Sequence, residues 1–522
     1  MIDGLYIVLL VVLIWIFGII SLAPRISKSK HFSLLGPALM VKSVSNRGII
    51  ERIAKRFPGI IFGRVSVVIV IVSALLAVAL LIYGSILSLS IKPSNAPSLS
   101  LLIGLPGINP AIPITFGLVA IILAVAIHEI FHGVVARRQG IKLNSVGALF
   151  FVIPVGAFVE PDENEIMKAD PVVRRRIVAA GPGINIVIAL ISLAIVAFLL
   201  VPSATPTHQG LYVESSTEHS PFAAVIPTGS ELISVGNSTL TYSGNSLINL
   251  SADSRLMPGM EYDAVVDESG KVTSVKVYAG MTIASILSGF PAQNASIPVG
   301  SVILSIDGHT IYNETGLSAY LDSVPPGSTI NMSLGIYSNG TLTSRNYSVI
   351  TTSAYRYYSM YDPSANSPAY RNYSFIGISL SYFGITGITL SSLQSLLSGN
   401  EVFTNPWTGM LEYISLPFAF LSPVPTSMAA LFTTPFNSYI FWGMVNTFYW
   451  LFWMDFLLGI TNALPIFILD GGQFFRDTLY ILSRRNAFRF LRDEKNLRMV
   501  TSFMGFVVLL LFMWEIIVPR IV

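Results

Sequence analysis

The sequence predicts a polytopic α-helical membrane protein that carries an extracytoplasmic β-rich insert. Of the 522 residues, 52% are apolar and only 11% are charged, and the mean hydropathy is +0.67. A typical soluble domain carries about a quarter charged residues, whereas a membrane helix needs roughly 20 apolar residues. Uncharged runs of that length occur at 4–24, 65–91, 93–127, 177–201 and 413–454. A soluble enzyme is therefore excluded, and the net charge of +3 does not indicate a nucleic-acid partner.

The basic residues predict how the first helices cross the bilayer. The run 4–24 lacks a basic start and a clear cleavage site, so we expect a helix that is retained. Nine Lys and Arg residues stand against Glu51 in 25–64, which the positive-inside rule places in the cytoplasm. The N-terminus is then outside. Residues 1–112 form an N-terminal helical region, and the following helices are expected at Val65–Leu89, Pro113–Val135 and Ile177–Val201.

The segment 205–371 differs sharply from the rest of the chain and is expected outside the membrane. It is rich in Ser, Thr, Asn, Tyr and Gly, with alternating apolar residues and turn dipeptides that are typical of short strands. Seven Asn-x-Ser/Thr sequons within it and an eighth directly after it predict glycosylation on the outer side. They are Asn237, Asn249, Asn294, Asn313, Asn331, Asn339, Asn346 and Asn372.

This insert also contains an internal repeat with a period near 70 residues. The segment 229–240 aligns with 300–311, Pro221-Phe-Ala and Pro291-Ala precede the two copies, and a Pro-Gly pair follows each copy. The order of these motifs resembles PDZ domains, which bind extended peptides by strand addition. Two PDZ-like domains are therefore expected, at 205–280 and 281–371.

The C-terminal part is predicted to return to the membrane. Four prolines break 413–454, so we expect a linker and a re-entrant or surface-lying membrane hairpin within 372–446. A helix at about 447–475, a basic cytoplasmic segment at 476–498 and a last helix at about Met499–Val518 would follow, with the C-terminus outside.

The third helix carries the motif His128-Glu129-Ile130-Phe131-His132. Residues four apart lie on one helix face, so both imidazoles can bind one zinc ion, with Glu129 beside it. Ionisable residues inside a membrane helix are costly and usually functional. The alternative is a structural His pair between helices. Without cysteine in the chain, thiolate ligands and disulfides are excluded.

A catalytic zinc ion takes three protein ligands and keeps one open position, so a third ligand is needed. Asp455 and Asp470 are the candidates on the late helix. Asp455 would lie roughly 22 Å from the depth of Asp470 if the residues between them were helical. Depth therefore favours Asp470, and Pro465 would free backbone groups beside it.

These motifs, together with Gly181-Pro182-Gly183-Ile184-Asn185 and Asn-x-x-Pro-x-x-x-Leu-Asp-Gly at 462–471, resemble the site-2 protease family of intramembrane zinc metalloproteases. The resemblance implies a catalytic membrane core at 113–204 and 447–522. It also implies that His128, His132 and Asp470 bind one zinc ion, with Glu129 as general base and acid, and that Asn185 and Asn462 steady the substrate or the oxyanion.

Residues 147–159 resemble the family's membrane re-entrant β-hairpin, whose edge would pair with an unwound substrate. Gly156, Ala157 and Phe158 would form that edge, although Ala157 and Phe158 replace the family's usual Gly and Tyr.

The function expected from these observations is hydrolysis of peptide bonds within or near transmembrane segments of a membrane-protein substrate, pre-trimmed by another protease. The zinc would lie near the cytoplasmic side of a multi-pass protein in the lipid bilayer. Two alternatives remain: a metal-dependent transporter, which would show flux without proteolysis, and an inactive PDZ-bearing scaffold, which would tolerate loss of Glu129. His208, His219 and His309 are expected on the solvated surface of the insert.

Overall fold

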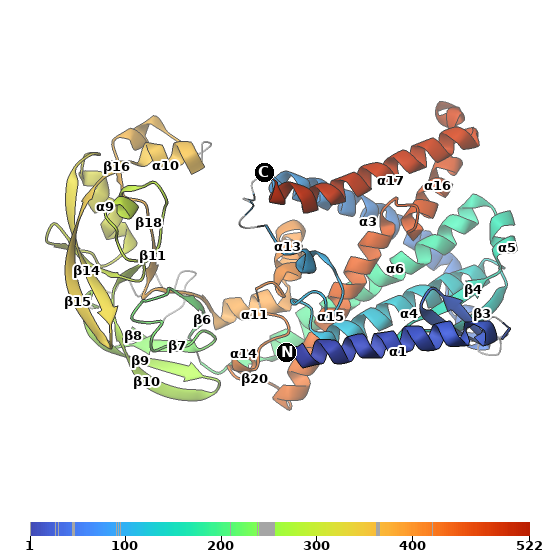
Figure 1. Ribbon diagram of the computed structural model, residues 1–522, viewed down its shortest axis with the longest axis horizontal. Helices are drawn as coiled ribbons and strands as arrows, with labels where there is room; N and C mark the ends of the chain where they lie inside the picture. The colour runs from blue at the N-terminus through green and yellow to red at the C-terminus, as the bar shows by residue number, and fades with distance from the viewer. Residues whose placement is uncertain are drawn as a thin grey trace. The chain divides into compact units, whose positions relative to one another are not determined.

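The computed structural model forms two compact units (Figure 1). The first comprises Met1–Val196, Ile414–Pro423 and Gly443–Val522, and the second comprises Ala197–Tyr413 and Val424–Trp442. The residues described are 2–26, 28–29, 31–43, 47–89, 91, 93, 96–208, 210–236, 238–239, 256–361, 366–419 and 421–521.

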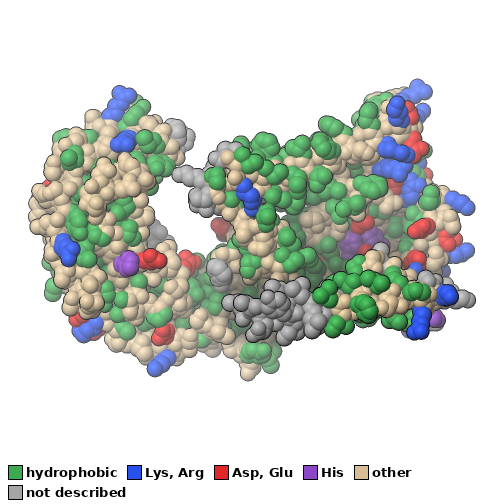
Figure 2. Space-filling view, in the orientation of Figure 1, with side chains coloured by type: hydrophobic (Ala, Val, Ile, Leu, Met, Phe, Trp, Pro, Cys, Tyr) green, Lys and Arg blue, Asp and Glu red, His purple; other side chains and the backbone are tan. Residues whose placement is uncertain are grey.

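The first unit is mainly helical, and within the described residues four of the chain's helices are long and apolar enough to cross a membrane. They are Gly59–Ser88, Ile114–Arg138, Pro171–Ser203 and Glu494–Arg520. Figure 2 shows hydrophobic side chains along α17 and α3, and Lys and Arg side chains gathered beside α16. The principal helices are α1 (Ile2–Ile26), α2 (Arg47–Arg56), α3 (Gly59–Ser88), α4 (Ile114–Arg138), α5 (Glu163–Lys168), α6 (Pro171–Ile195), α15 (Ser438–Ala463), α16 (Asp470–Leu482) and α17 (Glu494–Ile517).

Small residues let α6 pack closely at the centre of this unit. Ala179 and Ala180 are fully buried, and a Cβ at Gly183 would lie 2.5 Å from the Ser66 hydroxyl of α3. At the charged end of α6, Arg174 makes a bidentate ion pair with Asp477 of α16, with nitrogen–oxygen distances of 2.6 and 3.2 Å. Such pairs fix two planar groups in one geometry, so they orient α16 against α6.

An antiparallel sheet packs beside α4. Its order is β1-β2-β3-β4, with β1 at Phe32–Leu35, β2 at Ala38–Ser43, β3 at Leu143–Phe151 and β4 at Ile153–Pro161. The expected hairpin is therefore present but is longer than 147–159 and gains two strands from the basic N-terminal segment. Strand β4 is at the edge of the sheet, and its Val159 lies against Gly133 of α4, where a Cβ would be 2.5 Å from a Val159 methyl.

One continuous helix was expected at 447–475, but the structure has two helices there. The prediction of a single helix was therefore wrong. Helix α15 ends at Ala463 and α16 begins at Asp470. Pro465 lacks an N–H group and clashes with the preceding turn. Gly471 then packs against backbone, because a Cβ there would lie 2.2 Å from the Leu464 carbonyl oxygen. In 413–454 the elements are the end of α13 (Pro406–Ser415), the short α14 (Thr426–Ala429), β20 (Phe432–Thr433) and α15, which starts at Ser438. The membrane association expected for 372–446 stays a prediction.

The second unit contains two six-stranded sheets with equivalent strand orders. The first is β10-β9-β7-β6-β19 with β8 on β7, and the second is β15-β14-β12-β11-β18 with β13 on β12. The cross-strand pair Leu232↔Val266 in the first corresponds to Ile303↔Leu334 in the second. The repeat seen in the sequence is thus also a structural repeat.

The residue ranges of the strands define the two copies of this structural repeat. In the first sheet they are β6 (Leu211–Ser216), β7 (Glu231–Val235), β8 (Ser238–Thr239), β9 (Glu261–Glu268), β10 (Lys271–Tyr278) and β19 (Ile385–Thr389). In the second they are β11 (Met281–Ile286), β12 (Val302–Ile306), β13 (His309–Thr310), β14 (Thr329–Ser338), β15 (Thr341–Ile350) and β18 (Ile378–Tyr382).

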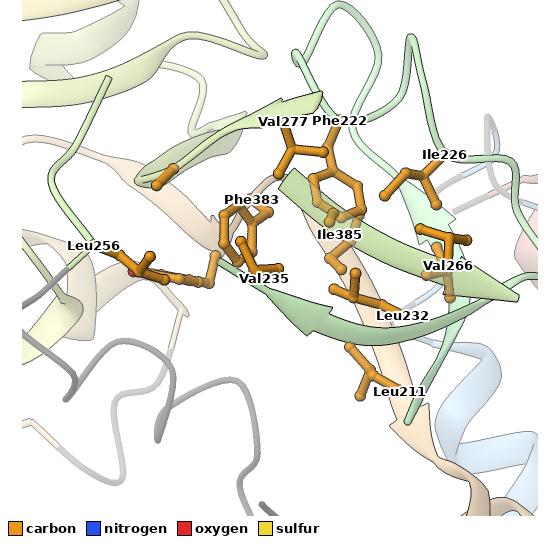
Figure 3. Close-up of a cluster of buried hydrophobic side chains, with 14 of the residues drawn as sticks. Leu211, Phe222, Ile226, Leu232, Val235, Leu256, Val266, Val277, Phe383 and Ile385 are labelled. Atoms are coloured by element: carbon orange, nitrogen blue, oxygen red, sulfur yellow. The ribbon is translucent and has the colours of Figure 1, made fainter. Parts of the chain in front are cut away.

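Strands β18 and β19 come after residue 371, so the expected domain end and linker start differ from the observed pairing. They are joined by Phe383 and Gly384, which both have positive φ, and each completes a different sheet. Phe383 is buried in the core of the first sheet, with its ring 5.2 Å from that of Phe222 (Figure 3). Local sequence could not reveal this, because the partner strands lie far away in the chain.

The remaining elements of the second unit are short. They include β5 (Thr205–Pro206), α8 (Pro291–Asn294), α9 (Glu314–Ser323), β16 (Thr352–Ser353), α10 (Ala354–Tyr361), β17 (Ser374–Phe375), α11 (Leu390–Ser398), α12 (Glu401–Thr404) and α13 (Pro406–Ser415). Among the sequons, Asn313 caps α9 by accepting a hydrogen bond from the Gly316 N–H. The exposed ones are Asn294, Asn331, Asn339, Asn346 and Asn372, whereas Asn237 and Asn249 lie outside the described residues. Glycosylation stays a prediction.

Candidate metal centre

Helix α4 places His128 and His132 one turn apart with their rings facing a common point. Their Nε2 atoms are 3.1 Å apart. Both side chains are largely buried, with 7% and 14% of their surfaces exposed. The four-residue spacing of the motif is therefore realised as a pair of converging nitrogens.

Asp470 joins the two histidines from the start of α16. Its Oδ2 atom is 2.9 Å from His128 Nε2 and 3.1 Å from His132 Nε2. The N-terminal end of a helix favours a negative charge, and Asp470 is the first residue of α16. Asp455 lies in α15, fully buried, and neither of its carboxylate oxygens has a hydrogen-bond partner in the described residues.

The outer ring nitrogens are held by groups of α6. His128 Nδ1 lies 3.1 Å from Asn185 Oδ1, and His132 Nδ1 lies 2.8 Å from the carbonyl oxygen of Ile177. An Nδ1–H donating to each oxygen leaves both Nε2 lone pairs free for a metal ion. Asn185 thus contacts His128 through its Oδ1 atom, and its expected role toward the substrate or the oxyanion stays a prediction.

Gly181 gives the two imidazoles their room. A Cβ at this position would lie 2.3 Å from His132 Nε2 and 2.6 Å from His128 Nε2. Any side chain would therefore occupy the space toward which the nitrogens point. The sequence showed this glycine in the Gly-Pro-Gly motif but did not reveal its role, which depends on contact with α4.

The residues present fit a zinc ion. Two ligands at about 2.0–2.2 Å from zinc are about 3.3–3.6 Å apart at a tetrahedral angle, and slightly closer at smaller angles. Two imidazole nitrogens and one carboxylate oxygen, mutually 2.9–3.1 Å apart, match that donor set and nearly that spacing. His128, His132 and Asp470 form the first of two groups in the described residues whose ligand atoms lie within 4.8 Å of one another.

Glu129 follows His128 directly on α4 and is partly buried. In the described part of the chain its carboxylate makes no hydrogen bond or ion pair, so it is not needed to hold a neighbouring helix. A free carboxylate beside a metal centre is a suitable group for proton transfer.

The other predicted site residues are distributed over two elements. Gly156, Ala157 and Phe158 lie on the edge strand β4, paired with Leu149, Ala148 and Gly147 of β3. Asn462 lies in the last turn of α15, partly buried, and the structure assigns it no hydrogen bond to the His-Asp cluster.

Comparison with known sequences agrees with this geometry. A sequence model described as Peptidase family M50 matches residues 116–511. An uncharacterized protein of Methanocaldococcus jannaschii is 40% identical over 88 residues, which are 17% of this chain and 24% of that protein. The matched segment therefore spans about a quarter of that relative's length.

Proposed function

The chain belongs to peptidase family M50, the site-2 protease family, and we propose that it is an intramembrane zinc metalloprotease. It would hydrolyse peptide bonds within or near transmembrane segments of membrane proteins. The observation that carries this proposal is the cluster of His128, His132 and Asp470 beside Glu129. Both histidines and Glu129 lie on α4, which is apolar enough to cross a membrane.

In this proposal, His128, His132 and Asp470 hold the metal ion and Glu129 moves the proton. A zinc ion, when bound, polarises a peptide carbonyl and lowers the pKa of water to about 7. Glu129 accepts the proton of the attacking water and returns it to the leaving amine. Asn185 and the Ile177 carbonyl keep both rings in the tautomer that this requires.

The edge strand β4 is proposed to bind the substrate. Peptide bonds in a transmembrane helix are hidden by their own hydrogen bonds, so a substrate must unwind before cleavage. An unwound segment can add to an open sheet edge by main-chain hydrogen bonds. Gly156, Ala157 and Phe158 on β4 would supply that edge, and Asn462 would steady the substrate or the oxyanion.

The insert is proposed to select substrates. In the chain, the insert follows α6 and precedes α15. It therefore separates the two segments of the proposed catalytic core, 113–204 and 447–522. Two folded PDZ-like repeats would obstruct a substrate that still carries a large outer domain. The partner would then be a transmembrane protein pre-trimmed by another protease, as in regulated intramembrane proteolysis, with the zinc near the cytoplasmic face.

The decisive experiment compares Glu129→Gln with His128→Ala in purified full-length protein. Glu129→Gln should abolish cleavage of a membrane substrate but retain zinc, because Glu129 is not a ligand. His128→Ala should lose both. Offering the substrate with and without its outer domain tests selection in the same assay.

Cleavage by Glu129→Gln above the level of His128→Ala would contradict the mechanism. Wild-type protein that carries ions without cutting any substrate would instead favour the transporter. A wild-type protein that is as inactive as Glu129→Gln would favour the scaffold.

A further inference from the structure

A second group of His, Glu and Asp side chains whose ligand atoms converge lies in the first sheet of the insert. It consists of His208, which precedes β6, with Glu231 on β7 and Asp267 on β9. His208 was expected on the solvated surface, but only 38% of its side chain is exposed and its ring faces two buried carboxylates.

The two acids are direct cross-strand partners inside the sheet. Glu231 pairs with Asp267 in the register of β7 and β9. Like charges directly opposite one another destabilise a strand pair. The side chains of Glu231 and Asp267 are 0% and 2% exposed, so water does not screen their repulsion.

Their hydrogen bonding leaves acceptor atoms unused. In the described residues, neither oxygen of Glu231 has a hydrogen-bond partner. Asp267 uses Oδ1 to accept the Gly270 N–H at 2.7 Å, which leaves Oδ2 toward His208. Gly210 lies directly over the Glu231 carboxylate, since a Cβ there would be 2.1 Å from Oε1. A fully buried carboxylate without any donor is costly unless a cation neutralises it.

The distances between His208 and the two acids are too long for hydrogen bonds and close to the spacing of ligands around one metal ion. His208 Nδ1 lies 3.7 Å from Glu231 Oε2 and 3.6 Å from Asp267 Oδ2. A charge-assisted hydrogen bond would be about 2.7–2.9 Å long, so the imidazole is bonded to neither acid. Two ligands of one tetrahedral zinc ion are about 3.3–3.6 Å apart, which is close to both distances.

The second sheet shows that this fold does not require acids at these positions. The pair that corresponds to Glu231↔Asp267 is Val302↔Gly335, at the same place in the register of β12 and β14. Val302 is buried there without any polar group. The acid pair is therefore specific to the first repeat, and the architecture alone does not account for it.

We propose that His208, Glu231 and Asp267 bind a divalent transition-metal ion of the zinc class, at a site separate from the His128 cluster. One imidazole nitrogen and two carboxylate oxygens suit Zn²⁺ better than Ca²⁺, which takes six to eight oxygen ligands. The ion balances the two negative charges. The exposed side of His208 leaves a route for the ion and a position for water.

The test measures zinc per chain in purified full-length protein that has been stripped with a chelator, reloaded with Zn²⁺ and desalted. The double variant Glu231→Val/Asp267→Gly copies the second repeat, and His208→Ala leaves both acids in place. Asp263→Asn, on the same strand β9 but exposed, is the matched control. Each of the first two variants should lose one equivalent of zinc, and the control should lose none.

The result does not depend on the proposed catalytic zinc. If the His128 cluster binds zinc, the content should fall from two equivalents to one, and in a His128→Ala background from one to none. If that cluster binds no zinc, the content should still fall by one. Unchanged zinc in His208→Ala and in the double variant would overturn the proposal, as would retention of Ca²⁺ in preference to Zn²⁺ by the wild type.

Discussion

Asp470 and Asp455 stand fifteen residues apart in the sequence but have different surroundings. Asp470 lies within 3.1 Å of two imidazole nitrogens, whereas Asp455 is buried in α15 without a hydrogen-bond partner in the described residues. We expect Asp470→Ala to lose one equivalent of zinc and to cut no better than His128→Ala. Asp455→Asn should keep its zinc, because the Asp455 carboxylate is not one of the proposed zinc ligands. Metal analysis beside a cleavage assay checks both, and the opposite pattern of metal content would identify Asp455 as the third ligand.

Burial raises the pKa of Glu231 to about 7, with a further contribution from the charge of Asp267. Because the folded-state pKa is above the unfolded value, the protonated carboxyl favours the fold below about pH 4.5, and this advantage is lost as the pH rises through about 7. In chelator-treated protein, Glu231→Gln should therefore stabilise the insert at pH 8 by about 1–3 kcal/mol and have little effect at pH 4.5. Thermal unfolding at the two pH values measures this difference. A variant less stable than the wild type at pH 8 would be the contrary result.

At the scale of elements, the sheet beside α4 depends on a residue without a side chain. A Cβ at Gly147 of β3 would lie 2.1 Å from the Val41 carbonyl oxygen of β2 and 2.5 Å from the Phe158 ring of β4. We expect Gly147→Ala to displace β4 and lower cleavage on the order of 10- to 100-fold, with zinc content unchanged since the ligands come from α4 and α16. Gly443→Ala is the control, because its Cβ would meet nothing within 4 Å. Equal cleavage by the two variants would show that the position of β4 is not critical.

The elements also show how far the sequence could predict the structure. The apolar runs predicted α3, α4 and α6, because a membrane helix needs only local hydrophobicity, and the four-residue spacing predicted that His128 and His132 converge. Strands β1 and β2 were missed because β2 pairs with β3, about a hundred residues away. The role of Gly181 was missed for a similar reason, since its contacts belong to another helix. Long-range pairing leaves little local signal.

At the scale of the whole molecule, the absence of cysteine makes topology directly testable. The charge pattern predicts that 25–64 and 476–498 are cytoplasmic and that the N-terminus, the insert and the C-terminus are outside. An impermeant thiol reagent should therefore label Asn339→Cys but not Asn486→Cys in intact cells, and should label both after lysis. Labelling of Asn486→Cys in intact cells would mean an additional crossing before α16.

The connection between β18 and β19 has a consequence for biosynthesis. Strand β6 ends at Ser216 and its outer neighbour β19 begins at Ile385, about 170 residues later. At about 5–20 residues per second, a ribosome needs roughly 8 to 34 seconds to supply that neighbour. Until then the nascent first sheet has an open edge, and the second sheet waits for β18 in the same way. Because β18 and β19 are consecutive in the chain, the ribosome supplies the last strand of both sheets within the same few seconds. A chain that stops before residue 378 would therefore leave both sheets without their last strand.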